Sequence, residues 1–199
     1  MTKSNLTYQS FLISKNHRNI KNNHKSIVIW MTGLSGAGKT SIANELEILL
    51  FSKNIQSYIL DGDNTRMGIS ADLDFSDTSR IENIRRIASV SKLMNDAGLV
   101  VITSLISPFE QNRELAKKII GDENFVLVYV KCDLETCEKR DVKGLYKKAR
   151  NGEIKNFTGI DSDFEVPKHP DIIIDTKNNT IDDSVRQIYN YIKAKLKLN

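Results

Sequence analysis

GLSGAGKT, at residues 33–40, stands between an apolar run at 26–32 and a segment of helical periodicity at 41–51. The run SIVIWMT is rich in β-branched and large apolar residues, which predicts a strand, and the segment SIANELEILLF predicts a helix. The spacing of the glycines, lysine and threonine matches G-x-x-x-x-G-K-[S/T], a pattern that requires a strand before it and a helix after it. This stretch therefore predicts an α/β fold with an anion-binding loop after its first strand.

The residue types of this loop indicate what it binds. Glycines let successive backbone N–H groups turn inward around phosphate oxygens, and the following helix adds the partial positive charge of its N-terminus. Lys39 would reach the β- and γ-phosphates of ATP, and Thr40 would offer a hydroxyl to Mg²⁺. A glycine-rich turn that binds nothing is the alternative, which the flanking elements disfavour. The predicted nucleotide-binding residues are Gly33, Leu34, Ser35, Gly36, Ala37, Gly38, Lys39 and Thr40.

The rest of the chain alternates apolar runs with helix-period segments. Further strands are predicted from SYILDG at 57–62, LVVITSL at 99–105, NFVLVYVKC at 124–132 and DIIID at 171–175. Most of these runs are too continuously apolar to have one face in water, which indicates strands buried on both faces. The predicted fold is an α/β three-layer sandwich of the P-loop type, with a parallel sheet between two layers of helices.

Two helices have predicted starts. The segment 79–98 opens with Ser79 and Glu82 in the spacing of a capping box and closes on Gly98. The last helix is predicted to begin at Thr180, with Asp183 three residues later. The expected inward-facing residues are Ile84, Ile87, Ala88 and Ser91 in the first helix, and Ile181, Val185, Ile188, Ile192 and Leu196 in the last.

Composition bounds the class of protein. The 199 residues are 40% hydrophobic and 27% charged, which predicts one domain at 26–199, preceded by an Asn-, Lys- and Ser-rich arm at 1–25. We expect the arm to be loosely ordered, with one short helix around residues 8–13. The lysines behind the net charge of +4 are spread without interleaved aromatics, so no nucleic-acid partner is expected.

Three further features bear on location. No apolar stretch reaches the length of a bilayer span, and the N-terminus lacks a continuous apolar segment with a cleavage site, so neither membrane binding nor export is expected. Cys132 and Cys137 stand five apart with no CxxC pattern and no histidine nearby, which indicates neither a zinc site nor a disulfide framework. A cytoplasmic location fits best.

Two acids follow the second predicted strand directly, in the sequence Asp61-Gly62-Asp63. Ligands of open parallel sheets bind at the carboxyl edge where these acids should lie, beside the phosphate loop. A carboxylate there can hold Mg²⁺ through a water or take a proton from an acceptor hydroxyl; the alternative is an aspartate that only caps a turn. A guanine-reading N-K-x-D is missing and LVVITSL ends in no acid, which favours a small-molecule kinase over a switch GTPase or a Walker-type ATPase.

Five blocks read in order resemble the adenylylsulfate kinases over about residues 25–176. These blocks are GLSGAGKT, LDGDNTRMGISADLDFS, RIENIRRIASVSKLMNDAGLVVI, LISPF and RDVKGLYKKARNGEIKNFTGID. The resemblance implies a P-loop kinase, commonly a homodimer, that uses Mg²⁺ and ATP to phosphorylate the 3′-hydroxyl of adenosine 5′-phosphosulfate. A phosphosulfate suits arginine forks better than lysine point charges, so Arg66 and Arg80 are our candidates to hold it.

The same resemblance assigns further roles. It implies that Arg66, Arg80 and Asn83 hold the substrate and that Phe75 and Phe157 sandwich its adenine, whereas each phenylalanine by itself suggests core packing. It also implies a basic lid at about residues 141–161. Beside and within that lid, Arg140 and Lys147 would meet phosphate charge during transfer.

Ser107 has two interpretations. It matches a serine that is described in this family as a phosphoserine intermediate, yet Ser107, Pro108 and Glu110 also have the spacing of a helix N-cap, N1 and N3. No histidine or lysine stands nearby in the sequence to activate the hydroxyl. We therefore favour direct in-line transfer, with Ile106 and Ser107 lining the acceptor pocket.

Two departures from the family pattern keep alternatives open. Ser79 replaces an aspartate, and residues 110–113 read Glu-Gln-Asn-Arg where the family has arginine, any residue, aspartate, arginine. The rivals are a kinase of the same fold for another nucleotide conjugate, which Glu110 and Asn112 favour, and a non-catalytic nucleotide-binding module. The predicted catalytic residues are Asp63, Asp61, Lys39, Ser107 and Arg140, with Thr40, Asp61 and Asp63 as candidates to hold Mg²⁺.

Overall fold

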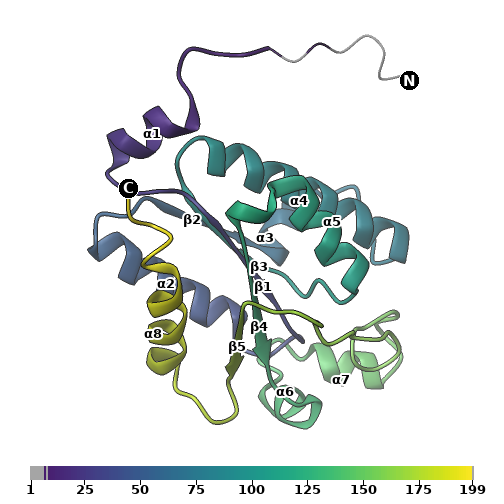
Figure 1. Ribbon diagram of the computed structural model, residues 1–199. Helices are drawn as coiled ribbons and strands as arrows, with labels where there is room; N and C mark the ends of the chain where they lie inside the picture. The colour runs from purple at the N-terminus through teal and green to yellow at the C-terminus, as the bar shows by residue number, and fades with distance from the viewer. Residues whose placement is uncertain (1–6, 8, 199) are drawn as a thin grey trace.

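The computed structural model describes residues 7 and 9–198, and in this part of the chain five parallel strands form one sheet (Figure 1). The strands are β1 (Val28–Thr32), β2 (Ser57–Asp61), β3 (Val100–Ser104), β4 (Phe125–Lys131) and β5 (Ile172–Asp175), in the order β2-β3-β1-β4-β5. Each lies within a predicted apolar run, so the strand predictions and the parallel sheet are confirmed. β1 is central, with Val28 paired with Val101 of β3 on one side and Phe125 of β4 on the other.

Helices cover both faces of the sheet, as the three-layer prediction requires (Figure 1). On one face lie α2 (Lys39–Ser52) and α8 (Ile181–Ile192), and on the other α4 (Asp77–Asp96) and α5 (Glu110–Ile120). Alternate residues of β1 serve the two cores: Ile29 and Met31 pack with α2 and α8, and Val28 and Trp30 pack with α4 and α5. All of β1 is buried, which explains its unbroken apolar sequence.

The start of α4 differs from the prediction. Ser76 is the N-cap and its hydroxyl accepts the N–H of Ser79, so the capping box predicted at Ser79 and Glu82 is wrong. Glu82 binds the guanidinium groups of Arg85 and Arg86 instead. The predicted inward stripe is confirmed, since Ile84, Ile87, Ala88 and Ser91 are all buried.

The last helix begins as predicted. The Thr180 hydroxyl accepts the N–H of Asp183, and Val185, Ile188 and Ile192 are buried. Leu196 is also buried, beyond the end of the helix. Ile181 is 46% exposed, so its predicted place in the stripe is wrong: Ser184, which is fully buried, faces inward in the first turn of α8 instead.

The N-terminal arm contains a helix, although not where it was predicted. Residues 9–13 are not helical, which makes the predicted helix at 8–13 wrong over its described part; residue 8 lies outside the described residues. α1 (Lys15–Asn22) begins instead after Ser14, its N-cap. It lies against the end of α4, where Asn22 donates to the Gly98 carbonyl.

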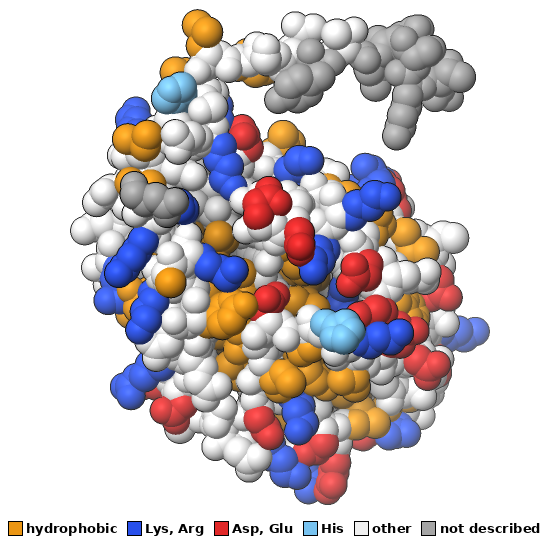
Figure 2. Space-filling view, viewed as in Figure 1, with side chains coloured by type: hydrophobic (Ala, Val, Ile, Leu, Met, Phe, Trp, Pro, Cys, Tyr) orange, Lys and Arg blue, Asp and Glu red, His pale blue; other side chains and the backbone are white. Residues whose placement is uncertain are grey.

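Short helices carry the chain through the connections. They are α3 (Gly62–Met67), α6 (Leu134–Arg140), α7 (Leu145–Arg150) and the 3₁₀ turn η2 (Asp122–Asn124). Within the described residues, no helix combines the length and apolar character needed to cross a membrane. On the face in Figure 2, basic and acidic side chains are interspersed and no large patch of one sign covers the surface.

Candidate functional site

The phosphate loop connects β1 directly to α2 at the carboxyl edge of the sheet. At two positions of the loop, backbone atoms of other segments lie too close to leave room for a residue larger than glycine. A Cβ at Gly33 would lie 2.4 Å from the Val130 carbonyl oxygen, and one at Gly36, where φ is +74°, would lie 2.9 Å from the Cys137 carbonyl oxygen. The loop therefore fits closely against β4 and α6.

Lys39 is buried inside this loop. Its ammonium group donates to the carbonyl oxygens of Gly33 at 2.9 Å and Leu34 at 2.7 Å. Burial lowers the pKa of Lys39 to about 8, because the charged form has lost most of its water. An anion bound at the centre of the loop would stabilise the charged form of Lys39.

Thr40 and Asp61 meet at the edge of the sheet. The Thr40 hydroxyl donates to Asp61 Oδ2 at 3.0 Å and lies 3.0 Å from Ser104 Oγ, at the end of β3. Asp61 Oδ1 accepts the N–H of Asp63, so Asp61 also caps α3. The sequence did not point to Ser104, which the pairing of Asp61 with Ser104 in the sheet brings to the site.

These oxygen donors suit a hard cation such as Mg²⁺. Among residues 7 and 9–198, no three His, Cys, Asp or Glu side chains gather into a metal cage. Mg²⁺ commonly takes one or two protein ligands and completes its shell with water and nucleotide phosphates. The Thr40 hydroxyl and the Asp61 carboxylate could provide that minimal set.

Asp63 faces the lid segment. Its carboxylate forms an ion pair with the ammonium group of Lys143, and both side chains are more than half exposed. This hydrogen bond raises the pKa of Lys143. Lys143 was not among the predicted site residues, because 80 residues separate it from Asp63 and only the fold brings the two together.

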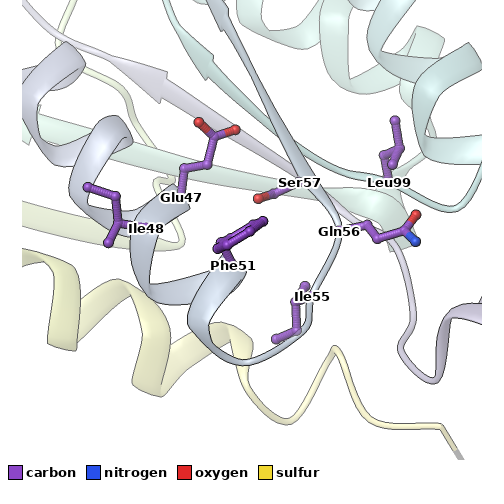
Figure 3. Close-up of a pocket in the computed structure, with 7 residues that line it drawn as sticks. All are labelled: Glu47, Ile48, Phe51, Ile55, Gln56, Ser57 and Leu99. Atoms are coloured by element: carbon purple, nitrogen blue, oxygen red, sulfur yellow. The ribbon is translucent and has the colours of Figure 1, made fainter.

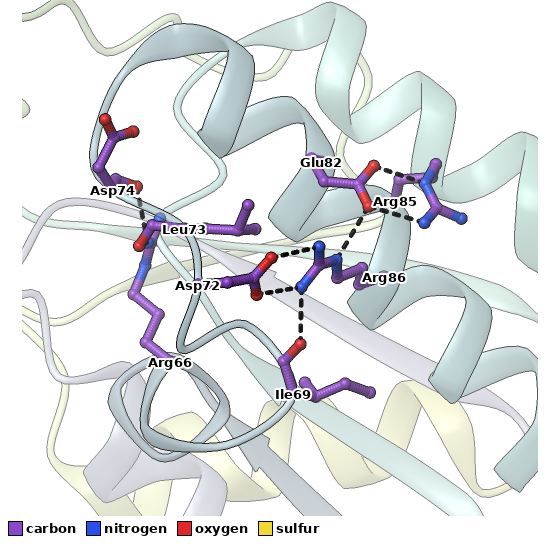
Figure 4. A network of polar contacts seen from close by, with 8 residues as sticks. All are labelled: Arg66, Ile69, Asp72, Leu73, Asp74, Glu82, Arg85 and Arg86. Carbon is purple, nitrogen blue, oxygen red and sulfur yellow. Dashed lines mark hydrogen bonds and ion pairs between the residues drawn. The ribbon is translucent and has the colours of Figure 1, made fainter.

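Arg66 and Phe75 lie beside Asp61 and Asp63, on the side where the substrate that accepts the phosphate is expected to bind; we call this the acceptor side. Arg66 lies one turn beyond Asp63 in α3, and its guanidinium carbon is 4.2 Å from the centre of the Phe75 ring. It also donates to the carbonyls of Leu73 and Asp74 (Figure 4). Phe75 is 57% exposed, so core packing does not explain it.

The surrounding loop is held at a second point. Arg86 binds the Asp72 carboxylate and the Ile69 carbonyl (Figure 4). The segment 69–74 is therefore fastened to α4 by Arg86 and to α3 by Arg66, which limits how far Phe75 can move.

Arg80 connects Phe75 to the lid segment. Its Nε donates to the Phe75 carbonyl at 3.0 Å, its Nη1 to Thr158 Oγ1 at 2.8 Å, and its Nη2 to the Asn156 carbonyl. Burial, followed by the nearby charge of Arg80, lowers the pKa of Arg66. Both guanidinium groups contact Phe75, since Arg66 lies over its ring and Arg80 donates to its carbonyl.

The remaining predicted substrate residues on this side are buried. The side-chain amide oxygen of Asn83 has no hydrogen-bond partner among the described residues. Phe157 is 9% exposed. Thr158, which follows it and receives the Arg80 hydrogen bond, was missed because neither its residue type nor its spacing suggested a site.

Ser107 lies in a tightly held loop before α5. It is buried, with φ at +43°, and its hydroxyl accepts the indole N–H of Trp30 at 3.1 Å. Its carbonyl accepts from Arg113 at 2.7 Å. The prediction of Ser107 as an N-cap is wrong, because these contacts hold it away from the helix, which begins at Glu110 with Phe109 as its N-cap.

Glu110 and Asn112, which depart from the family pattern, both lie in α5. Glu110 forms an ion pair with Arg113, whose side chain is fully buried. Asn112 is buried within α5, and its side-chain nitrogen has no hydrogen-bond partner among the described residues.

Ile106, predicted to line the acceptor pocket, lies beside the phosphate loop, since its carbonyl accepts the Gly33 N–H at 3.3 Å.

Arg140 and Lys147 occupy different positions. Arg140, at the end of α6, donates to the Thr176 carbonyl at 2.7 Å and approaches the Gly36 carbonyl at 3.4 Å, so it lies against the phosphate loop. Lys147 is exposed on α7, where its backbone N–H donates to Asp141. The structure brings Arg140 to the loop and leaves Lys147 on the outer face of the lid segment.

A pocket of about 500 Å³ lies elsewhere, at the amino edge of the sheet (Figure 3). It is lined by the end of α2, including Ile48 and Phe51, and by residues next to the starts of β2 and β3, including Ser57 and Leu99. Its lining is mostly apolar and lacks the convergent donors of the phosphate-loop edge. The candidate site is therefore the carboxyl edge, where charged groups and loop amides converge.

Comparisons with known proteins identify the family of the chain. Residues 25–175 match the family model described as "Adenylylsulphate kinase". The "Adenylyl-sulfate kinase" of Oceanobacillus iheyensis is 52% identical over 196 residues, covering 98% of each chain. The structure of the Mycobacterium tuberculosis APS kinase in complex with AMPPNP and APS is similar with a TM-score of 0.82 and 43% identity, over 85% of this chain and 98% of that one. A hexameric APS kinase from Thiobacillus denitrificans has a TM-score of 0.66 and 26% identity, over 87% of this chain and 30% of that one.

Proposed function

The chain belongs to the adenylylsulfate kinase family, and from that premise we propose that it transfers the γ-phosphate of ATP to the 3′-hydroxyl of adenosine 5′-phosphosulfate, giving 3′-phosphoadenosine 5′-phosphosulfate. It is an ATP-dependent kinase. The observation that carries the choice of acceptor is that Arg66 and Arg80 both contact Phe75, with Arg66 one helical turn from Asp63. Two guanidinium forks beside an open aromatic face suit an aromatic nucleotide with a phosphosulfate group.

Lys39 and the loop amides hold the ATP phosphates in this proposal. Mg²⁺, held by Thr40 with Asp61, supplies charge that offsets the phosphate oxygens. The hydrogen bond between Thr40 and Asp61 supports this division, because it aims a hydroxyl and a carboxylate at the same space. Arg140 adds positive charge from the end of α6, and Lys147 would join it only if the lid segment closes further.

Asp63 is then the general base. Its carboxylate accepts the proton of the 3′-hydroxyl while that oxygen bonds to the γ-phosphorus and the bond to the bridging oxygen of ADP breaks. Its exposure supports the assignment, because an acceptor hydroxyl can reach a carboxylate that is more than half exposed. Asp61 is less suited to the task, since both its oxygens already accept hydrogen bonds.

Transfer proceeds directly, without a phosphoserine. The Ser107 hydroxyl is buried and accepts the Trp30 N–H, so it shapes the acceptor pocket and does not attack phosphorus. Ser107→Ala is expected to retain turnover within about tenfold, the effect of one lost hydrogen bond. Abolished turnover, together with loss of a phosphoenzyme that can be isolated from the parent protein, would contradict direct transfer.

Three broader assignments complete the proposal. We infer a kinase domain at 26–199 with its lid at about 141–161, a homodimer, and a cytoplasmic location. The lid is supported by the contacts of Lys143 and Thr158 with Asp63 and Arg80. The cytoplasmic location is supported by Cys132 and Cys137, both of which are free thiols and buried.

The test is to mix the protein with Mg²⁺, ATP and adenosine 5′-phosphosulfate, to follow ADP release, and to determine where the new phosphate is attached. A 3′-phosphorylated product is expected, with Lys39→Met as the inactive control. ADP release only with another nucleotide conjugate would favour the rival kinase, although the pairing of Glu110 with Arg113 weakens that rival. No release with any acceptor would favour a binding module.

A further inference from the structure

One side chain of the lid segment, Tyr146, contacts both the phosphate loop and the acceptor side of the site. Tyr146, in the first turn of α7, is 1% exposed. Its hydroxyl donates to the carbonyl oxygen of Ser35, in the phosphate loop, at 3.0 Å. Burial raises the pKa of Tyr146, so the hydroxyl keeps its proton and remains a donor. The phosphate loop is thus tied to the lid by a neutral, buried hydrogen bond.

The ring of the same tyrosine packs against the acceptor side. The centres of the Tyr146 and Phe157 rings are 5.0 Å apart, and their planes meet at 77°, an edge-to-face contact. Phe157 is one of the two rings proposed to hold the adenine of the acceptor. Ser35 and Phe157 therefore contact the hydroxyl and the ring of one rigid side chain, which has only two rotatable bonds.

The neighbours of Tyr146 leave it little freedom. Asp141 accepts the backbone N–H groups of Tyr146 and Lys147 at 3.1 Å each, which fixes the start of α7. A second contact joins the same elements, because a Cβ at Gly159 would lie 3.2 Å from a methyl carbon of Leu34. The lid segment is thus closely packed on the phosphate loop at two points.

Phe157 is held equally firmly from its other side. Asp161 accepts the backbone N–H groups of Asn156 and Phe157, and Arg80 donates to the Thr158 hydroxyl. The contacts that run from Ser35 through Tyr146 to Phe157 are therefore flanked by hydrogen bonds at both the start of α7 and the segment around Phe157.

Core packing alone would explain the ring of Tyr146 but not its hydroxyl. The ring belongs to the main core cluster, together with Ala37, Cys137 and Ala149. A phenylalanine would fill the same space without a polar atom that needs a partner.

We propose that Tyr146 is a positioning residue that fixes the spacing between the phosphate loop and Phe157, so that nucleotide bound at the loop and acceptor bound at Phe157 strengthen each other's binding. The inference rests on the proposed function, because it requires adenosine 5′-phosphosulfate to bind at Phe157. By linkage, each ligand must change the affinity of the other by the same factor.

Two matched variants separate this role from a general loss of stability. Tyr146→Phe removes only the hydroxyl that reaches Ser35. Tyr191→Phe is the control, since it also removes a tyrosine hydroxyl that donates a hydrogen bond, in this case to Asp171 at 2.9 Å, on α8 and outside the site. A third variant, Tyr146→Leu, removes the hydroxyl and the ring edge together. Thermal melting verifies that each variant is folded.

The experiment is calorimetric titration of each protein with adenosine 5′-phosphosulfate, alone and saturated with a non-hydrolysable ATP analogue. The ratio of the two dissociation constants is the coupling factor. We expect tighter acceptor binding in the presence of the analogue for the parent protein and for Tyr191→Phe. Tyr146→Phe should reduce the factor by about 2- to 10-fold, the effect of one hydrogen bond, and leave acceptor binding without nucleotide unchanged. Tyr146→Leu should also weaken acceptor binding without nucleotide.

Three results would overturn the inference. A coupling factor of one in the parent protein would show that the two sites do not communicate, and an unchanged factor in Tyr146→Phe would show that the hydroxyl plays no part. In both cases the acceptor still binds, so the proposed function survives. No acceptor binding to the parent protein under either condition would refute the proposed function, and the inference with it.

Discussion

Asp61 and Asp63 are separated by one glycine but have different surroundings. Asp61 is held by the Thr40 hydroxyl and by the backbone N–H of Asp63. Asp63 has a side chain that is 64% exposed and a single ion pair, to Lys143. The structure thus separates two acids that the sequence left equivalent.

Replacing Asp63 with asparagine tests its proposed role as the base. We expect Asp63→Asn to lower kcat by about 10² to 10⁴, the range for general-base catalysis, and to leave the affinity for an ATP analogue unchanged. Steady-state ADP release and calorimetry measure the two quantities. Asp182→Asn, an exposed carboxylate in the first turn of α8, is the control. A rate within about threefold of the parent would refute the assignment.

Lys39 should take up a proton when ATP binds. Burial favours its neutral form and lowers its pKa to about 8, so in the free protein it loses its proton as pH rises through that value. Phosphate oxygens favour the charged form and raise the pKa again. At about pH 8.5, ATP binding should therefore be accompanied by net proton uptake by the protein. This uptake should become smaller as the pH falls below about 7.

Titrations of ATP in two buffers of different ionisation enthalpy measure this uptake. Lys39→Arg is the matched control, because arginine keeps its charge at every pH of interest and should bind without proton uptake. The same uptake in Lys39→Arg as in the parent protein would show that another group takes the proton.

At the scale of elements, Lys15 is one of three described residues that attach α1 to the domain, together with Arg18 and Asn22. The Lys15 ammonium donates to the side-chain oxygens of Asn95, near the end of α4, and Asn124, in η2. Asn95 is buried, so its oxygen would lose a partner that water cannot easily replace.

Lys15→Met is therefore expected to lower the free energy of unfolding by about 1–3 kcal/mol, the cost of a buried acceptor left without a donor. Urea denaturation measures the change, and activity at low temperature should be unaffected because α1 lies away from the phosphate loop. Lys21→Met, an exposed lysine on the same helix, should change stability by less than about 0.5 kcal/mol. Equal effects of the two substitutions would show that Lys15 does not anchor the helix.

The sequence predicted the elements whose signals are local. β1, β3 and β4 were found because burial on both faces leaves unbroken apolar runs, and α8 because Thr180 and Asp183 form its cap. The start of α4 was missed because Ser76 and Ser79 are equally good caps and only the fold chooses between them. α1 was missed because the partners of Lys15 lie 80 and 109 residues away.

The same rule separates the site residues that were found from those that were missed. The phosphate loop and the two acids are motifs of consecutive residues, so their pattern alone indicated them. Ser104, Lys143 and Thr158 reach the site through contacts with residues far along the chain. Lys143 and Thr158 lie in the predicted lid, but nothing in the sequence singled out these two residues within it.

At the scale of the whole molecule, a dimer is the expected state. Large apolar side chains remain in solvent on the single chain, among them Phe51 at 82% and Leu93 at 71% exposure, and association commonly covers such groups. Sedimentation equilibrium should give twice the chain mass of 22.6 kDa at micromolar concentration. A mass of one chain over that range would contradict the dimer.

The order of the strands has a consequence for how the protein is made. β1 is among the first strands to leave the ribosome, yet its two neighbours begin only at Val100 and Phe125. The phosphate loop that follows β1 is thus synthesised long before β4, against which Gly33 must close. A nascent chain must therefore carry the largely apolar β1 without any partner until β3 has been made, and without its second partner until β4 has been made. An unpaired apolar strand of this kind is the circumstance in which chains aggregate or recruit chaperones.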